Sequence, residues 1–322
     1  MRNRNMSMIE KIKRFVERPA RLPIGIMLRY AHAFHNQKAL VKGLYWMAFG
    51  KQLNLKNPKT FNEKTQWLKV YDHNPLYHKL VDKYEVKKIV AEKIGEEYII
   101  PTLGVWNSFD EIDFNSLPNQ FVLKTTTGGG NTGVVICSDK GSFNLQDAQT
   151  KLEASAKNDI YKSMGEWVYK DIIPRFIAEK MLVNDNGGDL ADYKIFCFNG
   201  VPKILFYASN RQNAKHDPPF FDYYDMQLNK LDIRSRGHQN SPSIIKPFLE
   251  FEQMKELAAK LSKGIPFVRV DFYLVNNKIY FGELTFYHDS GLVPFIPEEW
   301  DAILGGMIEI KSISNKTDKV RE

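Results

Sequence analysis

Apolar residues recur along the chain with two different periods, which predicts amphipathic helices interleaved with short strands. The segment TFNE at 60–63 forms a capping box, because its threonine and glutamate can exchange hydrogen bonds with each other's backbone N–H, and it predicts the start of a helix. A second helix is expected from about Leu76, and Gly95 ends it. Further helices are expected near 145–158 and 250–262.

Apolar runs bounded by turn residues predict the strands. The Asn199-Gly200 pair between two such runs is the strongest local hairpin signal in the chain. Hairpins and helices in this order, without βαβ repeats, predict an α+β fold. The expected strands are 99–106, 121–124, 176–182, 192–198, 201–208, 267–274 and 279–286.

Length and composition fit a folded protein with about two domains. The chain has 322 residues, of which 43% are hydrophobic, so a sizeable buried core is expected. Cys137 and Cys197 are its only cysteines. They are too few for a disulfide framework, so we expect two buried thiols in a reducing, cytoplasmic compartment.

The charge balance favours an anionic partner without pointing to nucleic acid. Lysine and arginine number 45 against 38 acidic residues, a net charge of +7. The basic residues are spread along the chain, and no zinc-finger spacing, RNP-like pattern or arginine-rich tract occurs, so we expect no nucleic-acid binding. No segment approaches the roughly 20 apolar residues of a membrane-spanning helix. The basic N-terminal 35 residues can contact an anionic membrane surface, although a solvated helix is the favoured interpretation.

A strand that ends in Lys124 runs into the loop TTTGGGNTG at 125–133 and returns as a strand. Glycines allow backbone N–H groups to close on phosphate oxygens, and a lysine at the strand end adds positive charge. The spacing is not that of a P-loop. Phosphate binding and a merely flexible turn therefore remain equal alternatives for this loop.

The segment FIAEKML at 176–182 is an apolar strand with Glu179 and Lys180 inside it. An extended segment with apolar neighbours can offer a purine one backbone acceptor and one backbone donor. The alternative is an edge strand that carries a solvated charge pair.

The predicted hairpin 268–286 carries Arg269, Asp271 and Glu283 between apolar neighbours. Charged groups in such surroundings need partners, and two facing carboxylates suit Mg²⁺ bound together with nucleotide phosphates. A solvated sheet face is the less favoured alternative.

The register of this hairpin decides whether the carboxylates can share a metal. A two-residue Asn276-Asn277 turn would place Asp271 and Glu283 on opposite faces. We therefore expect a three-residue loop over 276–278 that sets Asp271 opposite Glu283. A bulge elsewhere in the hairpin would restore the same parity.

The polar turn that follows, with His288, Asp289, Ser290 and Gly291, is a place where a second substrate can meet backbone donors. We expect Ser290 and Gly291 to contribute to it. His288 is expected to be a surface loop residue. A Ser/His/Asp triad is disfavoured, because Ser290 lacks the glycine-flanked elbow of hydrolases.

In chain order these pieces resemble the TupA-like group of the ATP-grasp superfamily, over about Pro58 to Trp300. Each motif is weak alone, and the ordered set is specific. The motifs are PKTFNEKTQWLKVYDHNP, DKYEVKKIVAEKIGEEYIIPTLGVW, LPNQFVLK, DYKIFCFNG and RVDFYLVNNKIYFGELTF with SGLVPF.

The resemblance implies an ATP-grasp fold, in which two α+β subdomains hold ATP and Mg²⁺ between them. It implies a helical N-terminal region over 1–75, a subdomain with the glycine loop over 76–175, and a subdomain with the metal-binding hairpin over 176–322. Thr285 stands where the family commonly has asparagine as a further ligand. The implied phosphate ligands are Lys83, Lys124 and the loop glycines Gly128, Gly129 and Gly130; the other implied nucleotide contacts are Glu179, Lys180, Met181, Leu182, Asp192 and Lys194; the implied metal ligands are Asp271, Glu283 and Thr285, with Arg269 beside the transferring phosphoryl group.

The activity that the resemblance implies is activation of a carboxylate by ATP as an acyl phosphate, followed by attack of an amine. The association of such proteins with bacterial polysaccharide and teichuronopeptide genes suggests a uronic acid and an amino acid as partners, in a capsule or cell-wall glycan. Three alternatives stay open: a glycosyltransferase, for which no convincing DxD motif is present; a sugar or polysaccharide kinase; and a scaffold that binds anionic glycan without catalysis.

Overall fold

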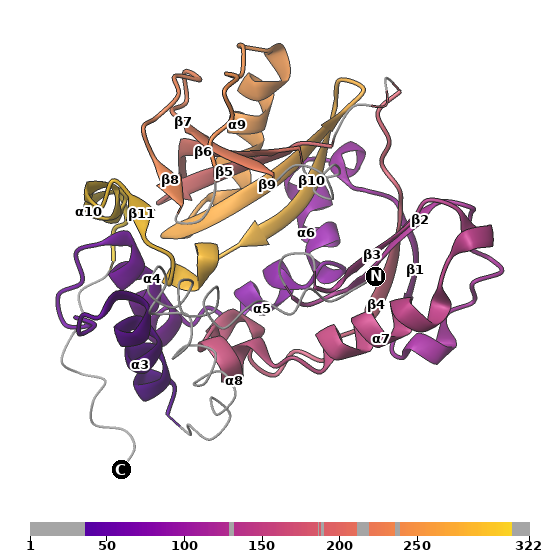
Figure 1. Cartoon of the computed structure of the whole chain (residues 1–322), viewed down its shortest axis with the longest axis horizontal. Helices are drawn as coiled ribbons and strands as arrows, with labels where there is room; N and C mark the ends of the chain where they lie inside the picture. Colours follow the sequence, from indigo (N-terminus) through magenta and orange to yellow (C-terminus); the bar gives the residue numbers. More distant parts are fainter. Residues whose placement is uncertain are drawn as a thin grey trace, which may run out of the picture.

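The computed structural model describes residues 36–128, 132–185, 187, 190–210, 219–235 and 239–310. In these residues two antiparallel sheets occupy opposite sides of the molecule, and short helices lie between and around them (Figure 1). The predicted α+β class is confirmed. The helices are α3 (Gln37–Phe49), α4 (Phe61–Tyr71), α5 (Leu76–Val81), α6 (Glu85–Ile94), α7 (Leu145–Ala156), α8 (Ile160–Met164), α9 (Leu249–Ser262) and α10 (Glu299–Met307), with 3-10 turns that include η5 (Trp167–Tyr169) and η6 (His288–Gly291).

The smaller sheet has four strands in the order β1-β4-β2-β3. Its buried side chains, among them Phe121, Leu123 and Phe176, form a core of their own with Leu152 of α7. Because β4 pairs with a strand on each side, the alternative of a solvated edge strand is wrong. The strands are β1 (Thr102–Trp106), β2 (Phe121–Thr125), β3 (Val134–Cys137) and β4 (Phe176–Lys180).

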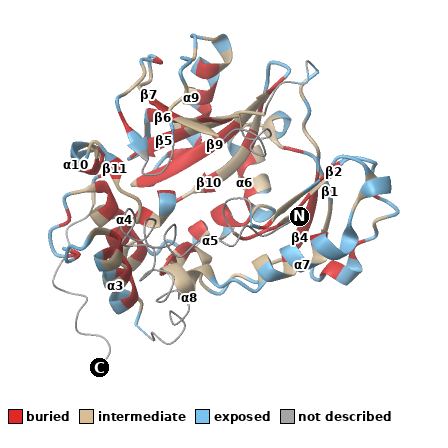
Figure 2. Ribbon diagram, in the orientation of Figure 1, coloured by how far each residue is buried: buried red, intermediate tan, exposed pale blue. Residues whose placement is uncertain are grey.

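The larger sheet has five strands in the order β10-β9-β5-β6-β7, and α9 packs on it. The buried side chains of this sheet belong to the main core, which also takes in side chains of α4, α5 and α6; buried residues are red in Figure 2. A two-stranded ladder joins β11 (Phe295–Ile296) to β8 (Arg234–Ser235). The strands are β5 (Asp192–Phe198), β6 (Val201–Ser209), β7 (Phe220–Tyr224), β9 (Phe267–Val275) and β10 (Lys278–Thr285).

Two local predictions for the helices meet the structure differently. The capping box at α4 is confirmed, because the Thr60 hydroxyl accepts from Glu63 N–H while Glu63 accepts from Thr60 N–H. The single helix expected from Leu76 to Gly95 is wrong. It is two helices, because the Asp82 carboxylate accepts the N–H groups of residues 84 and 85 and starts α6 anew.

Two hairpins of the larger sheet turn on two residues in left-handed conformation. Asn199 and Gly200 have φ of 52° and 83°, which confirms the first hairpin. Asn276 and Asn277 have φ of 50° and 59° and pair Val275 with Lys278. The expected three-residue loop is therefore wrong.

The cores do not divide at the boundaries expected for the subdomains. Strand β4 follows residue 175 and yet lies between β1 and β2, so the smaller sheet continues to Lys180. Helices α5 and α6 contribute Tyr77 and Val90 to the core of the larger sheet. The three-part division itself stays a prediction.

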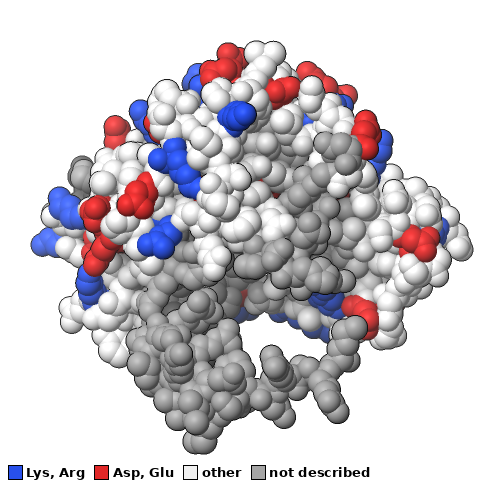
Figure 3. All heavy atoms as spheres, turned by 45° about the horizontal axis from the view of Figure 1, so that its top comes forward, with Lys and Arg blue, Asp and Glu red and all other residues white. Residues whose placement is uncertain are grey.

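Several expectations concern the surface and the chain as a whole. Both cysteines are buried free thiols, as expected. No helix among the described residues is long and apolar enough to cross a membrane. The N-terminal segment expected to be basic and amphipathic, up to residue 35, lies outside the described residues. On the face in Figure 3, acidic and basic side chains are interspersed, which gives no support there to a scaffold with one extended basic surface.

Candidate functional site

Asp271 and Glu283 stand directly opposite each other on β9 and β10. The register shifts between Phe281 and Glu283, so Gly282 is an extra residue on β10. This bulge reverses the parity that the two-residue turn would otherwise impose. The predicted pairing is thus confirmed, by the bulge that was the second route to it.

Gly282 suits this position because a side chain would crowd the neighbouring strand. A Cβ atom there would lie 3.1 Å from the Asp271 carbonyl oxygen and 3.2 Å from the Tyr273 ring. The bulge also leaves Tyr280 paired with Tyr273 on the face that carries the charged groups. Phe281 takes the buried position instead.

Arg269 lies at the centre of the carboxylate pair. Its Nε and Nη2 atoms each donate to one oxygen of Asp271, both at 2.7 Å, and Nη2 also donates to Glu283 Oε1 at 3.3 Å. The Nη1 atom donates to Nδ1 of His288 at 3.1 Å. A guanidinium has five N–H groups, so one on Nη1 has no partner among the described residues and is free to meet a substrate.

Lys194 of β5 joins the same cluster. Its ammonium lies 2.5 Å from Asp271 Oδ2 and 3.4 Å from Asp192 Oδ1. Burial alone would raise the pKa of Asp271, but Arg269 and Lys194 outweigh it and hold that pKa below its usual value. Asp271 is therefore ionised at neutral pH, as a metal ligand must be.

The glycine loop is tied at its base to the residue that precedes β4. Thr126 N–H donates to the Arg175 carbonyl, and Arg175 N–H donates to the Thr126 hydroxyl. Gly128 has a φ of 108°, a conformation that favours glycine, and its carbonyl accepts from Lys83 Nζ at 2.5 Å. Gly129 and Gly130 lie outside the described residues. Their implied role stays a prediction.

Lys124 meets Glu179 rather than open solvent. The two Glu179 oxygens lie 2.5 Å from the ammonium groups of Lys124 and Lys87. Burial alone would raise the pKa of Glu179, but the two lysines outweigh it and lower that pKa. A carboxylate held between two cations leaves each of them partly unneutralised, so both can still attract phosphate.

Lys83 connects the two sheets. Its ammonium bonds to the Gly128 carbonyl and lies 4.0 Å from Glu283 Oε2. Burial lowers the pKa of Lys83, and Glu283 opposes that effect. The glycine loop and the carboxylate hairpin thus converge on one lysine.

Together these groups nearly balance in charge, with the basic side chains one ahead. Such a cluster can accept a polyphosphate and a divalent cation together without burying a large net charge. The basic members are Lys83, Lys87, Lys124, Lys194 and Arg269, and the acidic members are Glu179, Asp192, Asp271 and Glu283.

The chain leaves β4 at Lys180, and Met181 and Leu182, which follow it outside any helix or strand, are half-buried. Lys180 N–H donates to the Pro101 carbonyl, and its side chain is exposed. Backbone groups of Met181 and Leu182 make no hydrogen bond to other described residues, so they are free to pair with a ring. Adenine binding here stays a prediction.

The donor set of the hairpin fits Mg²⁺. Magnesium in nucleotide sites takes one or two carboxylates and fills its remaining positions with phosphate and water. Asp271 and Glu283 supply two carboxylates. Among the described residues no group of three or more histidine, cysteine or acidic side chains could hold a metal ion by itself. The Thr285 hydroxyl donates to Glu283 Oε1 at 3.1 Å, so in this structure it orients a carboxylate.

The η6 turn holds Ser290 and Gly291 with φ of 57° and 60°, after Asp289 at 48°. This left-handed conformation costs free energy for residues other than glycine, and here hydrogen bonds from α4 stabilise it. Lys69 Nζ donates to the Ser290 carbonyl at 2.8 Å and to the Ser290 hydroxyl at 2.7 Å. Gln66 Nε2 donates to the carbonyls of Ser290 and Gly291. Substrate binding by the turn stays a prediction.

Sequence reasoning missed three residues of this site, and it was wrong about His288, which is 2% exposed. Lys69, Gln66 and Lys87 sit on helices whose polar positions look solvated, and only the fold shows that they are turned inward. The sequence carries no signal for Lys69 and Gln66, because both lie on α4 at positions that a helix with a single buried stripe would leave exposed.

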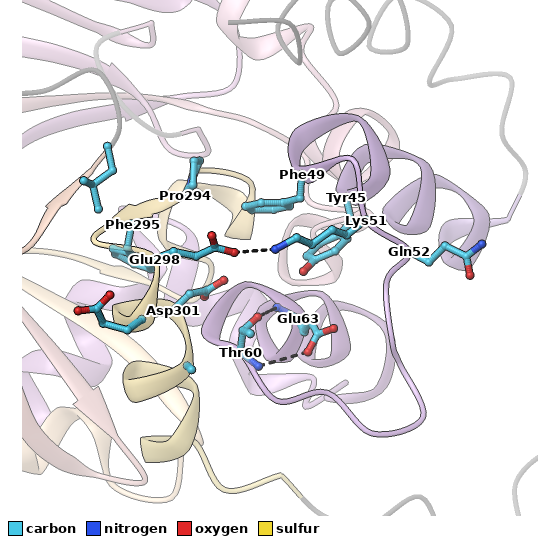
Figure 4. Close-up of a pocket in the computed structure, with 13 residues that line it drawn as sticks. Tyr45, Phe49, Lys51, Gln52, Thr60, Glu63, Pro294, Phe295, Glu298 and Asp301 are labelled. Carbon is cyan, nitrogen blue, oxygen red and sulfur yellow. Dashed lines mark hydrogen bonds and ion pairs between the residues drawn. The ribbon is translucent and has the colours of Figure 1, made fainter.

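A separate pocket of about 600 Å³ lies away from this cluster, between α3 and α4 on one side and β11 and α10 on the other (Figure 4). Three of its acidic groups already have structural partners. Glu63 caps α4, Asp301 Oδ1 accepts from Asn62 N–H, and Glu298 pairs with Lys51 at 2.6 Å. The carboxylate hairpin, not this pocket, combines the groups that chemistry on phosphate needs.

Comparisons with known proteins bear on the fold of the chain. Residues 63–309 match the family model described as TupA-like ATPgrasp. A search of curated proteins found no significant match. Similar solved structures include D-alanine–D-alanine ligase from Bacillus anthracis complexed with ATP, with 14% identity and a TM-score of 0.39 over 64% of this chain and 55% of that one.

Two further structures are similar to the same extent. N5-carboxyaminoimidazole synthetase from Staphylococcus aureus complexed with ADP has 16% identity and a TM-score of 0.36, over 72% of this chain and 52% of that one. D-alanine–D-alanine ligase from Helicobacter pylori has 16% identity and a TM-score of 0.39, over 77% of this chain and 69% of that one. The matches span little more than half the length of the first two ligases, and similarity at this level transfers no activity.

Proposed function

Because the chain belongs to the TupA-like ATP-grasp family, we propose that it is an ATP-dependent ligase that joins a carboxylate to an amine. In this reaction a carboxylate oxygen attacks the γ-phosphorus of ATP and ADP leaves. The amine nitrogen then attacks the acyl carbon of the acyl phosphate, inorganic phosphate leaves, and the nitrogen loses a proton. The product is an amide.

One observation carries the proposal: Lys83 lies between the carbonyl of Gly128 and the carboxylate of Glu283. A lysine in that position can contact phosphate oxygens held by the loop while it faces the hairpin. Lys124, at the end of β2, would contact the same phosphates from the smaller sheet. Positive groups arranged around a transferring phosphoryl stabilise its charge, which is the main demand of phosphoryl transfer.

Asp271 and Glu283 would hold Mg²⁺. Bound there with nucleotide, the ion would neutralise phosphate charge and orient the transferring group. Arg269 would direct its free Nη1 N–H toward the oxygen on which negative charge develops. Adenine would lie against the backbone of Met181 and Leu182.

For the substrates we propose a uronic acid of a bacterial capsular or cell-wall polysaccharide as the carboxylate and an amino acid as the amine. Support comes from the substrates that the resemblance to TupA-like proteins implies, and from the net charge of +7, which favours an anionic glycan. We further propose that the reaction takes place in the cytoplasm, where ATP is available and the two free thiols stay reduced.

The test is a screen of uronic-acid glycans and amino acids for ADP release. We expect release only when both substrates are present, and a product mass equal to the sum of the two minus water. With ¹⁸O in the carboxylate, one ¹⁸O atom should appear in the released phosphate, because that oxygen attacked phosphorus.

Matched variants complete the design. Glu283→Gln should abolish ADP release, whereas Glu256→Gln, at an exposed position of α9, should leave it unchanged. ADP release with glycan alone, with the phosphate retained on the sugar, would identify a kinase and refute the ligase. Transfer from a UDP-sugar would refute both.

A further inference from the structure

His288 is buried at the end of β10, and the reaction outlined above gives it no role. Its ring packs against Phe196, Phe206 and Phe295, with ring centroids 4.7, 5.3 and 6.4 Å away. The one side-chain hydrogen bond that His288 makes to another described residue joins its Nδ1 to Arg269 Nη1, at 3.1 Å. Nε2 is buried without a hydrogen-bond partner among the described residues, and Asp289 Oδ2 is 3.5 Å from it.

The chemistry of arginine fixes the state of this histidine. A guanidinium can only donate, so Nδ1 of His288 must accept, and the proton of the neutral ring is on Nε2. Burial lowers the pKa of His288 to about 4, and the nearby Arg269 lowers it as well. The ring is therefore a neutral acceptor throughout the physiological range.

A residue kept only for stability would not be built in this way. A buried Nε2–H without a partner destabilises the fold, and a phenylalanine ring would suit the surrounding aromatic side chains without that cost. What phenylalanine cannot supply is the acceptor at Nδ1. The acceptor is the feature that distinguishes histidine at this position.

The acceptor matters most when the site is loaded. The other partners of Arg269 are the carboxylates of Asp271 and Glu283, whose oxygens are also the candidate metal ligands. An oxygen that binds a cation has less capacity left for the guanidinium. His288 is not one of the candidate metal ligands, so a bound cation would not compete with Arg269 for its Nδ1 atom. Its other ring nitrogen, Nε2, lies on the side of the ring away from Arg269.

We propose that His288 is a positioning residue that holds Nη1 of Arg269 when Asp271 and Glu283 turn to metal, so that the remaining Nη1 N–H stays directed at the reacting oxygen. The proposal rests on the proposed ligase function for its kinetic consequence. It makes His288 a support for Arg269 and gives it no contact with substrate.

Two variants separate the acceptor from the ring. His288→Phe keeps an aromatic ring and removes the acceptor, whereas His288→Asn places an amide oxygen near the position of Nδ1. We expect His288→Phe to lower kcat for ADP release about tenfold to a hundredfold, the effect of losing one hydrogen bond to a charged group, with KM for ATP within about twofold of wild type. His288→Asn should recover most of that kcat.

A spectroscopic readout tests the same idea without turnover. In ¹⁵N-labelled protein with Mg²⁺ and ADP, rotation about the Cζ–Nη1 bond of Arg269 should be slow in the wild type and in His288→Asn and fast in His288→Phe, with Arg269→Lys used to assign the signal. A urea midpoint of His288→Phe at or above that of the wild type near pH 7.5 would show that the variant is folded.

Each outcome decides the proposal. Equal kcat in wild type and His288→Phe, equal losses in the phenylalanine and asparagine variants, or a restricted Nη1 in His288→Phe would overturn it. If the wild type releases no ADP with any substrate pair, the ligase function fails, and the rotation measurement still decides whether His288 holds Arg269.

Discussion

Acidification should weaken the fold through His288 by an amount that can be calculated. The pKa of this ring falls from 6.5 in the ordinary state to about 4 in the fold, first because it is buried and also because Arg269 and Lys194 are near. Asp271 and Asp289 act in the opposite direction and are outweighed. Between about pH 6.5 and about pH 4, His288 is therefore protonated in the unfolded chain and neutral in the folded protein.

The sign follows from this difference in proton binding. Because the folded pKa is the lower one, stability is fully present above the unfolded pKa and falls as pH drops from about 6.5 toward about 4. Between about pH 7.5 and pH 5, linkage at about 1.4 kcal/mol for each pKa unit gives a loss of about 2 kcal/mol from this one ring.

The assay is urea unfolding of the wild type and of His288→Phe at both pH values. Other groups also titrate in this range, so the quantity of interest is the difference between the two proteins. We expect the wild type to lose about 2 kcal/mol more than the variant on acidification. Equal losses in the two proteins would refute the reasoning, because they would mean that His288 takes up its proton as easily in the fold as in the unfolded chain.

Two further predictions concern the nucleotide and the metal. Lys83→Ala and Lys124→Ala should each weaken ATP binding about tenfold to a hundredfold in calorimetry, because each would remove a charge-assisted hydrogen bond to phosphate in the proposed site; unchanged affinity in both would refute the phosphate assignment. Gly282→Val should weaken Mg²⁺-dependent ATP binding, since a Cβ atom there would lie 3.1 Å from the Asp271 carbonyl and would widen the bulge. Gly306→Ala, where a Cβ atom would meet nothing within 4 Å, is the control, and equal binding by the two glycine variants would show that the bulge does not set the metal site.

Strands β5 and β6 could be predicted well because their signals are local, whereas β7 was not predicted. Period-two alternation and an Asn-Gly turn placed 192–198 and 201–208 within one residue of β5 and β6. The hairpin register could be predicted only from the requirement that Asp271 and Glu283 share a metal. Facing carboxylates were required, and the sequence offered two ways to achieve them, a longer loop or a bulge. The structure takes the bulge, because paired asparagines adopt left-handed turns readily and Gly282 tolerates the crowding.

The parts of the site that could not be predicted depend on contacts between distant segments. Lys69 and His288 have no local signature, since what buries them is the packing of α4 and of three phenylalanines from other strands and turns. Lys87 is one of several lysines on α6, and only the position of β4 selects it as the partner of Glu179. Ion pairs between elements follow from tertiary structure, so a single sequence cannot rank them.

The support that α4 gives to the η6 turn has a consequence for truncation. The family match begins at residue 63, inside α4 and beyond its cap, so a fragment cut there would lose the Thr60 hydroxyl that accepts from Glu63 N–H. Helix α3 is needed too, because Gln37 Nε2 donates to the carbonyls of Lys69 and Gly165, each at 2.8 Å. A fragment trimmed to the family boundary would keep Gln66 and Lys69, which contact Ser290, but would lose the contacts from Thr60 and Gln37 that hold α4 itself. A fragment meant to keep the η6 turn in place should therefore begin before Gln37.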